Sequence, residues 1–465
     1  MRRVPVVTLI AAFAPLVTQA QRPARAPVVK IDYVEDSLPN GLTVLYHVDH
    51  STPVAAVDIW YNVGSKNEEV GRTGFAHLFE HMMFKGSRNV ADGQHFALLE
   101  AAGGRAGSDI NGTTWTDRTN YFESVPSNQL ELALWLEADR MGTLTETLTP
   151  EKLENQREVV KNERRETFDN QPYGSWFEKL MAYSFPEEHP YHHAVIGSMR
   201  DLSAATVEDV RKFFRTYYAP NNAVLTIAGD IDVAQAKAAV RKYFGGIPRG
   251  PAVPPLADMR LPPVMGTEQR AVLQDENAPA PAVYVSFRVP PAKDSAWAVV
   301  SLLGSVIADG KSSKLFASLV REQQIAANVF GGNFGLVDGA DVLFFAAVGK
   351  PGGDPAALEH ALLEAIERAK GEISQEDLDR VRAGARFSFV DGLQTMGGFG
   401  GRADRLDEGY VYHHNPNYVN TVLDKYDAVT LAQLRALAGE RLVPLNRVTL
   451  VYVPKTQQVS ARATP

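Results

Sequence analysis

Two histidines and a glutamate stand close together in the apolar segment GFAHLFEHMMFKGS, which runs from Gly74 to Ser87. In a helix, residues i and i+4 share a face, so His77 and His81 can direct two imidazoles at one point. Glu80 lies about 300° round the helix from His77, which places its carboxylate beside the same point. Two imidazoles, a carboxylate within reach and room for water are the features of a catalytic zinc site.

The bare pattern also fits two polar residues on a half-exposed helix face, so the neighbouring side chains matter. They are apolar nearly all round the predicted helix, which is typical of a buried helix. These neighbours are Phe75, Ala76, Leu78, Phe79, Met82, Met83 and Phe84. Because buried polar groups need partners and a metal ion supplies them, the context favours a metal site.

A third protein ligand is expected from the acidic helix TPEKLENQREVVKNERRETFDN. We take Val159 and Val160 as markers of its buried face. Glu163 lies about 40° from Val159 and about 60° from Val160, so it is expected to point inward with them. Glu158 lies about 200° from Val160 and is the alternative ligand.

With these residues in view, the sequence resembles the M16 family of metallopeptidases, the pitrilysin, insulysin and mitochondrial processing peptidase group. The order H-x-x-E-H is that of the inverzincins. The resemblance covers roughly residues 30 to 250 and extends more loosely into the second half through GKSSKLFASLVREQQIA. It rests on the segments HLFEHMMFKGS, LEAAGGRAGSDINGTTWTDRTNYFESVP, LEADRM, REVVKNERRETFDNQPYG, HPYHHAVIGSMRDL and YYAPNNAVLTIAGDID.

The resemblance implies that His77 and His81 bind zinc, that Glu80 activates water and that Glu163 is the third ligand. Two features depart from the family. Gln156 stands where the family has a supporting glutamate, and the spacing from His81 to Glu163 is several residues longer than usual. Spacing alone would suit Glu158 better, so both glutamates stay open as ligands at this point.

Two further groups of polar residues are candidates for a role in the site. Asn111 matches a family strand that pairs with extended peptide substrate by β-augmentation. Its alternative role is that of a turn residue before Gly112. The histidines of HPYHH, at positions 189, 192 and 193, raise the idea of a second metal, which is disfavoured because no nearby carboxylate has ligand spacing.

Composition narrows the class of protein. The chain has 465 residues, with 47 basic and 55 acidic residues and a net charge of −8. This length favours two or more domains, and no basic run suggests a nucleic-acid surface. Cysteine is absent, so the chain forms no disulfide, and any metal must be held by His, Asp or Glu.

The first twenty residues predict export. They have a basic start at Arg2 and Arg3, an apolar stretch from Val4 to Val17 and small residues before a cut after Ala20. This pattern is typical of a secretory signal peptide, and the apolar stretch is short for a bilayer span. We expect an exported protein, located in a periplasm, without a membrane span after cleavage.

An internal repeat indicates a duplicated domain. The segment from Thr206 resembles the segment from Thr430, at an offset of 430 − 206 = 224 residues. Both predict an amphipathic helix, a proline break and a strand, at residues 223–228 and 447–453. The pairs that recur at this offset are Thr206 and Thr430, Arg211 and Arg435, Pro220 and Pro444, and Asn222 and Asn446.

Strands and long helices mix in each half, so the fold class expected is α+β, with two homologous domains that form a duplicated half-chamber. The domains expected are a signal peptide at 1–20, a catalytic zinc-binding domain at 30–247, a linker at 248–265 and a non-catalytic domain at 266–460. Other strands are predicted at 55–63, 119–125, 282–289 and 342–348. Helices are predicted at 74–84, 94–102, 127–140, 150–168, 295–307, 354–370 and 375–389.

The function expected is that of an exported zinc endopeptidase that hydrolyses peptides held as an added strand inside a chamber. Zinc would polarise the scissile carbonyl and lower the pKa of its bound water, while Glu80 accepts the proton and passes it to the leaving amine. One alternative is a non-catalytic assembly subunit, which the intact H-x-x-E-H set disfavours. The other is a processing peptidase dedicated to one exported precursor.

The second half predicts a partner chain. At the 224-residue offset, Ser301, Gly304 and Ser305 stand where the first half has its metal set, so one site per chain is expected. Family members of this length pair two chains, and the long members supply an Arg and a Tyr from the non-catalytic half. Here Arg321 is present, but Ala326, Val329 and Phe330 stand where the tyrosine is expected. We therefore expect a homologous subunit without H-x-x-E-H, or a second copy of this chain.

Overall fold

The computed structural model describes residues 29–455, in which two sheets are each accompanied by helices. The prediction of a signal peptide at residues 1–20 lies outside the described residues. The first sheet has the strand order β1-β2-β6-β3-β5-β4 and the second has the order β7-β11-β8-β10-β9. Strands of the first sheet are β1 Val34–Ser37, β2 Thr43–Val48, β3 Val54–Tyr61, β4 Ile110–Thr114, β5 Thr119–Pro126 and β6 Ala223–Gly229. Strands of the second are β7 Gln269–Asp275, β8 Ala282–Val289, β9 Ala326–Asn333, β10 Asp341–Gly349 and β11 Arg447–Pro454.

The helices divide between the halves in the same way. Those of the first half are α1 Phe75–Met82, α2 Gln94–Ala101, α3 Leu130–Thr143, α4 Pro150–Arg164, α5 Trp176–Ser184, α6 Met199–Ala204, α7 Val207–Tyr217 and α8 Val233–Phe244. Those of the second half are α9 Trp297–Ala308, α10 Pro355–Glu372, α11 Gln375–Gly392, α12 Arg402–His413, α13 Val422–Ala428 and α14 Leu431–Arg441.

The two sheets share one topology, which bears out the predicted α+β class with two homologous domains. In each, one parallel pair (β2 with β6, β7 with β11) is followed by three antiparallel pairings in the same order. Thr206 and Thr430 begin the equivalent helices α7 and α14 with capping boxes. Asn222 and Asn446 each donate a hydrogen bond, of 2.8 and 2.9 Å, to the carbonyl of the last residue of that helix.

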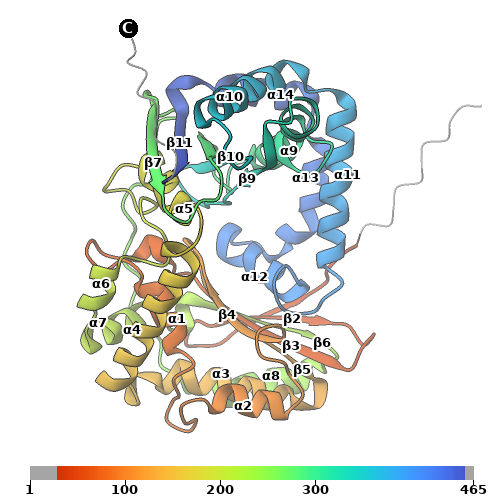
Figure 1. The fold of residues 1–465 in the computed structure, drawn as a ribbon. Coiled ribbons are helices and arrows are strands. Elements are labelled where there is room, and N and C mark those ends of the chain that lie inside the picture. Colours follow the sequence, from red (N-terminus) through yellow and green to blue (C-terminus); the bar gives the residue numbers. More distant parts are fainter. Residues whose placement is uncertain (1–28, 456–465) are drawn as a thin grey trace, which may run out of the picture. The chain divides into compact units, whose positions relative to one another are not determined.

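Each half has its own buried core of aliphatic and aromatic side chains. In the first half, α3 packs on β3 and β5 on one side of the sheet, with α8 beside it (Figure 1). The central strand β6 is covered on both faces, because all seven of its residues are buried.

From Ile31 onward the described chain forms one compact unit, because each half lends a helix to the sheet of the other. Helix α12 of the second half packs on β3 and β6 of the first sheet, where Met396 and Ala403 meet Ala56 and Ala228 (Figure 1). Helix α5 of the first half packs on β8 and β11 of the second sheet. The exchange covers sheet faces that would otherwise lie exposed.

Several predicted elements differ from the structure at their ends. The helix expected over 150–168 is α-helical only to Arg164 and continues as a π-helical turn, Arg165–Asp169. The helix expected from residue 127 begins as a 3₁₀ turn, Ser127–Gln129, and becomes α-helical at Leu130. Residues 248–265 contain neither helix nor strand, and the domain boundaries remain predictions. Among residues 29–455, no helix has both the length and the hydropathy that a membrane crossing requires.

Candidate metal centre

Helix α1, which carries the histidines, has its first turn fixed by a buried carboxylate. Glu68 accepts hydrogen bonds from the backbone N–H of Gly74 (2.9 Å) and of Ala76 (2.7 Å). A carboxylate at this end of a helix satisfies free N–H groups and complements the helix dipole. His193 Nε2 lies 2.9 Å from the same carboxylate, so it braces Glu68.

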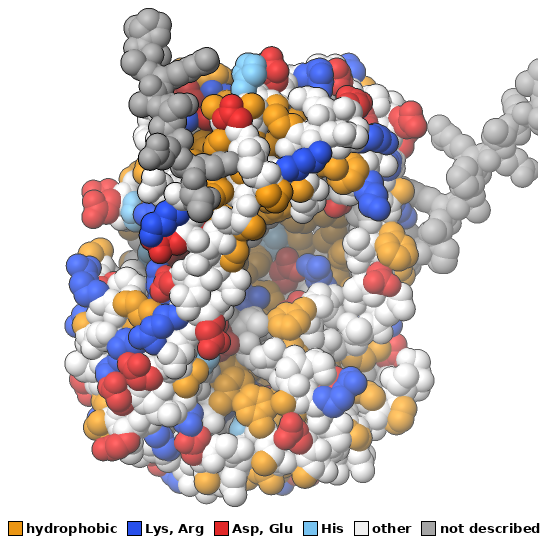
Figure 2. All heavy atoms as spheres, in the orientation of Figure 1, with side chains coloured by type: hydrophobic (Ala, Val, Ile, Leu, Met, Phe, Trp, Pro, Cys, Tyr) orange, Lys and Arg blue, Asp and Glu red, His pale blue; other side chains and the backbone are white. Residues whose placement is uncertain are grey.

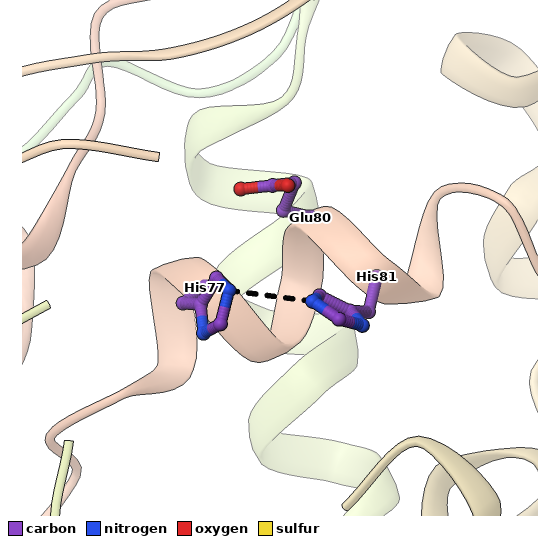
Figure 3. Close-up of side chains that lie close together, drawn as sticks. All are labelled: His77, Glu80 and His81. Carbon is purple, nitrogen blue, oxygen red and sulfur yellow. Dashed lines mark hydrogen bonds between the residues drawn. The ribbon is translucent and has the colours of Figure 1, made fainter. Parts of the chain in front are cut away.

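The helix presents His77 and His81 on successive turns, with their ring planes nearly perpendicular, at 84°, and their centroids 4.8 Å apart (Figure 3). Their Nε2 atoms lie 3.3 Å apart. From α4, Oε2 of Glu163 lies 3.4 Å from Nε2 of His81 and 3.7 Å from Nε2 of His77. Three potential ligand atoms from two helices therefore converge on one point.

The positions of the two candidate glutamates differ. Helix α4 buries Leu153, Gln156 and Val160, and Glu163 continues this face one turn after Val160. Glu158 points to solvent and forms an ion pair with Lys161 at 2.9 Å. Val159, which we expected on the buried face, is 40% exposed, so only Val160 marks that face correctly.

The protonation states expected at this site follow from burial and from neighbouring charges. Burial lowers the pKa of His77, which therefore stays a neutral imidazole at neutral pH. Burial opposes the charged form of His81 too, but hydrogen bonding to Glu163, the charge of Glu80 and contact with Gln156 raise its pKa. The same bond to His81 lowers the pKa of Glu163, which is therefore a carboxylate.

Glu80 lies on the same helix, beside the histidines (Figure 3). Its side chain is held by β4, because Thr114 Oγ1 donates a 2.7 Å hydrogen bond to Glu80 Oε2. Among the described residues, no group forms a hydrogen bond with the other carboxylate oxygen of Glu80, Oε1. One oxygen is thus fixed, and the second is available for proton transfer.

Strand β4 is the edge of the first sheet and passes beside α1. Asn111 lies on it, where its side chain donates to Gly107 O at 3.1 Å and accepts from Gly112 N at 2.9 Å. Asn111 is therefore in a strand, although its side chain makes turn-like local contacts. An edge strand offers free backbone groups to an extended peptide.

The site residues fit a zinc ion. Two nitrogens bound to one zinc at 2.0–2.1 Å in a tetrahedral arrangement lie about 3.3–3.4 Å apart. The 3.3 Å between the imidazoles and the 3.4 and 3.7 Å to Glu163 match that requirement closely. Two imidazoles and a carboxylate are also the donor set of hydrolytic zinc sites.

Another cluster of possible metal ligands lies in the same half, but a cation already occupies it. His95, Glu123 and Glu137 bring ligand atoms together in the buried core. Arg140 donates to Glu137 and, at 3.2 Å, to Glu123, so its guanidinium pairs with both acids. This cluster is a buried ion-pair network.

The three histidines of HPYHH have separate partners. His189 lies 3.1 Å from the carbonyl of Met259, and His192 lies 2.9 Å from that of Phe185. His193 contacts Glu68, as described above. The structure therefore does not gather these histidines around one point.

Sequence reasoning missed two residues that support the site. Glu68 lies in a loop, where a single glutamate carries no periodic signal. Thr114 lies three residues after Asn111 in the segment INGTT. The only signal for Thr114 was that this segment resembles a strand.

Comparison with known proteins places the chain in a family. It matches the family described as Insulinase (Peptidase family M16) over residues 43–194, and the one described as Peptidase M16 inactive domain over residues 204–385. The zinc protease PqqE of Helicobacter pylori is 31% identical over 364 residues, which cover 77% of this chain and 80% of the relative. The chain belongs to peptidase family M16.

Solved structures agree with the M16 assignment. A protease from Helicobacter pylori superposes with a TM-score of 0.84 at 28% identity and covers 92% of this chain and 100% of its own. The first half of the periplasmic protease PqqL from Escherichia coli gives a TM-score of 0.71 at 18% identity, covering 92% of this chain and 94% of its own. At that identity the second similarity establishes the fold alone. The candidate metal centre lies within the part that matches the M16 peptidase domain.

Proposed function

We propose that this M16 protein is an exported zinc-dependent endopeptidase. The observation that carries the proposal is the convergence of His77, His81 and Glu163 on one point, beside Glu80. His77, His81 and Glu163 would hold the ion. When bound, zinc would polarise the scissile carbonyl and lower the pKa of a water molecule.

Glu80 is the general base in this proposal. Thr114 holds one carboxylate oxygen, so the other can accept a proton from water and later deliver it to the leaving amine. The buried position of Glu80, 9% exposed, limits competition from bulk water for that proton.

The substrate proposed is an extended peptide paired with β4 as an added strand, with Asn111 beside the bond that is cut. This mode needs a free strand edge next to the metal, and β4 has both properties. Backbone pairing gives affinity without demanding one sequence, so we propose a general peptidase rather than a peptidase for a single precursor.

The location proposed is outside the cytoplasm. The basic start, the apolar stretch and the small residues before position 21 support export, and one structural relative is described as a periplasmic protease. N-terminal sequencing of the native protein should find a start near Gln21. A protein that keeps Met1 would contradict export.

A partner chain is part of the proposal. Arg321 lies in the second half, whereas Ala326, Val329 and Phe330 lie on β9 and none can donate a side-chain hydrogen bond to an oxyanion. We propose that a homologous chain without H-x-x-E-H, or a second copy, supplies the missing group. Measuring the oligomeric state together with peptide turnover tests this proposal. Full activity from a monomer would exclude a partner chain. An active homodimer would exclude only the homologous chain without H-x-x-E-H.

The test of the function is peptide hydrolysis by the full-length chain before and after metal removal. An internally quenched peptide should be cleaved, with activity lost on chelation and restored by about one zinc per chain. If the chain alone is inactive, the assay is repeated with its homologous partner. Cleavage that survives complete chelation, or a chain that never binds zinc, would favour the alternative of a non-catalytic subunit.

A further inference from the structure

The second half of the chain contains a cavity of about 620 Å³ at the position equivalent to the metal centre. Ser301 and Ser305 of α9 line it, and they correspond at the 224-residue offset to His77 and His81. Arg380 of α11 also lines it and corresponds to Asn155 of α4 at the offset of 374 − 149 = 225 residues between the N-caps of the two helices, Ser374 and Thr149. The helix pair that holds the metal centre in the first half therefore borders a pocket in the second.

Residues of two further helices, α12 and α13, also line this second-half pocket. Figure 2 shows a hollow in this face, in the region where Figure 1 places α9, α11 and α12. Aromatic side chains form part of its wall, including Trp297 and Tyr426, whose ring centroids lie 5.8 Å apart. The pocket thus combines a cation with an apolar surface.

Arg380 lacks a strong partner. Its shortest ion pair, to Asp377, is 3.9 Å long, and its Nη2 is buried without a hydrogen bond. Asp377 is engaged elsewhere, by Lys314 at 2.7 Å and as part of the capping box with Ser374. The other arginine of the pocket, Arg405, is paired with Glu408 at 2.5 Å. Arg380 is therefore the arginine of this pocket that is available to a ligand, and Lys311, an exposed lysine, also belongs to the lining.

A second donor without a partner also lines the pocket. Nε1 of Trp297 is buried and has no acceptor. A buried N–H or guanidinium without an acceptor is costly, and a bound ligand with several oxygen atoms would supply an acceptor to each. Guanidinium geometry matches a carboxylate, with two parallel hydrogen bonds.

We propose that the second-half pocket binds a carboxylate attached to an apolar or aromatic group, as in a short peptide, with Arg380 as the donor to the carboxylate and Trp297 Nε1 as a donor to another oxygen of the ligand. The carboxylate can come from a peptide C-terminus or from an acidic side chain. Binding there needs no metal, so it is separate from the proposed hydrolysis and can succeed or fail independently of it.

The test is calorimetric titration of the chelated, full-length chain with three probes: N-acetyl-Leu-Tyr, its C-terminal amide and N-acetyl-Asp-Tyr-amide. N-acetyl-Leu-Tyr, the Asp-containing amide or both should bind saturably, and the amide without a carboxylate should bind at least about tenfold more weakly. Preference for N-acetyl-Leu-Tyr assigns the source to a C-terminus, and preference for the Asp-containing amide to acidic side chains. Equal binding of all three, or no saturable binding up to about 10 mM of any probe, overturns the proposal.

Variants locate the site. Arg380→Met should weaken the carboxylate probes at least about tenfold, and Trp297→Phe should weaken them while the ring remains. Arg260→Met, at an exposed arginine outside the pocket, is the matched control and should bind as wild type. If Arg380→Met does not fold, Ser305→Leu, which fills the pocket, must abolish binding. Wild-type affinity in either folded variant would overturn the assignment.

Discussion

Oε2 of Glu163, on α4, lies 3.4 Å from Nε2 of His81, on α1. Glu158, also on α4, faces solvent and pairs with Lys161. Glu163→Ala should therefore lower zinc occupancy, as should His77→Ala and His81→Ala, because each removes one ligand atom. Glu158→Ala, which changes the same residue type on the same helix, should keep wild-type zinc. Metal analysis of the purified variants measures this. Loss of zinc from Glu158→Ala but not from Glu163→Ala would reverse the assignment.

Thr114 is a positioning residue for Glu80. Thr114→Val keeps the shape of the side chain but removes the 2.7 Å hydrogen bond to Oε2. We expect kcat to fall about tenfold, with zinc content unchanged, since Glu80 loses its fixed orientation. Thr114→Ser restores the hydroxyl and should recover most of the rate. A Val variant with wild-type kcat would show that the bond has no role in catalysis.

Glu68 should matter for stability through the start of α1. Its side chain is fully buried. It accepts hydrogen bonds from the backbone N–H groups of Gly74 and Ala76 and lies against Nε2 of His193. Glu68→Ala should cost about 3 kcal/mol of unfolding free energy, because these donors lose their acceptor in a buried place. Glu69→Ala changes the exposed neighbour and is the control. Denaturant unfolding compares the two, and equal midpoints would contradict the role of Glu68.

Asp407 of α12 should make stability depend on pH. It is buried against the first sheet, where burial and the nearby Asp58 and Asp404 raise its pKa well above the usual value, although Thr226 donates a hydrogen bond to it. A raised pKa means that the folded state holds the proton more tightly. The stability that this provides is complete below about pH 4, the usual pKa of Asp, and is lost as pH rises toward the raised value.

Asp407→Asn should therefore stabilise the protein by about 1–3 kcal/mol at pH 8 and by less at pH 5, because the amide keeps an acceptor for Thr226 and carries no charge. Denaturant unfolding at the two pH values measures the difference. Asp424→Asn, at an exposed position on α13, should change neither value. An equal effect of Asp407→Asn at both pH values would contradict this account.

Local patterns predicted much of the fold. The strand at 282–289 agrees with β8 at both ends, and the repeat offset identified α7 and α14 as equivalent helices. Strand β9 was not predicted, because its residues include Gly331 and Gly332, which favour loops in a sequence. Helices α5 and α12 were not predicted either, and their exchange between the sheets depends on tertiary packing that a local pattern does not carry.

For the candidate site, helix periodicity was sufficient to favour Glu163 over Glu158, even though Val159 proved exposed. It was sufficient because the deciding residues share a helix with a fixed angular repeat. The contacts of Glu68 with α1 and His193, and of Thr114 with Glu80, join separate elements. Such contacts depend on tertiary packing, which no local pattern carries.

The central claim is that Glu80 is the general base of a zinc peptidase, and Glu80→Gln tests it most directly. The change keeps the size of the side chain and leaves His77, His81 and Glu163 in place. Zinc content and peptide turnover are measured on the same preparation. We predict wild-type zinc with turnover reduced by about 10²–10⁴-fold or more, whereas a zinc-loaded Glu80→Gln protein with wild-type turnover would contradict the account.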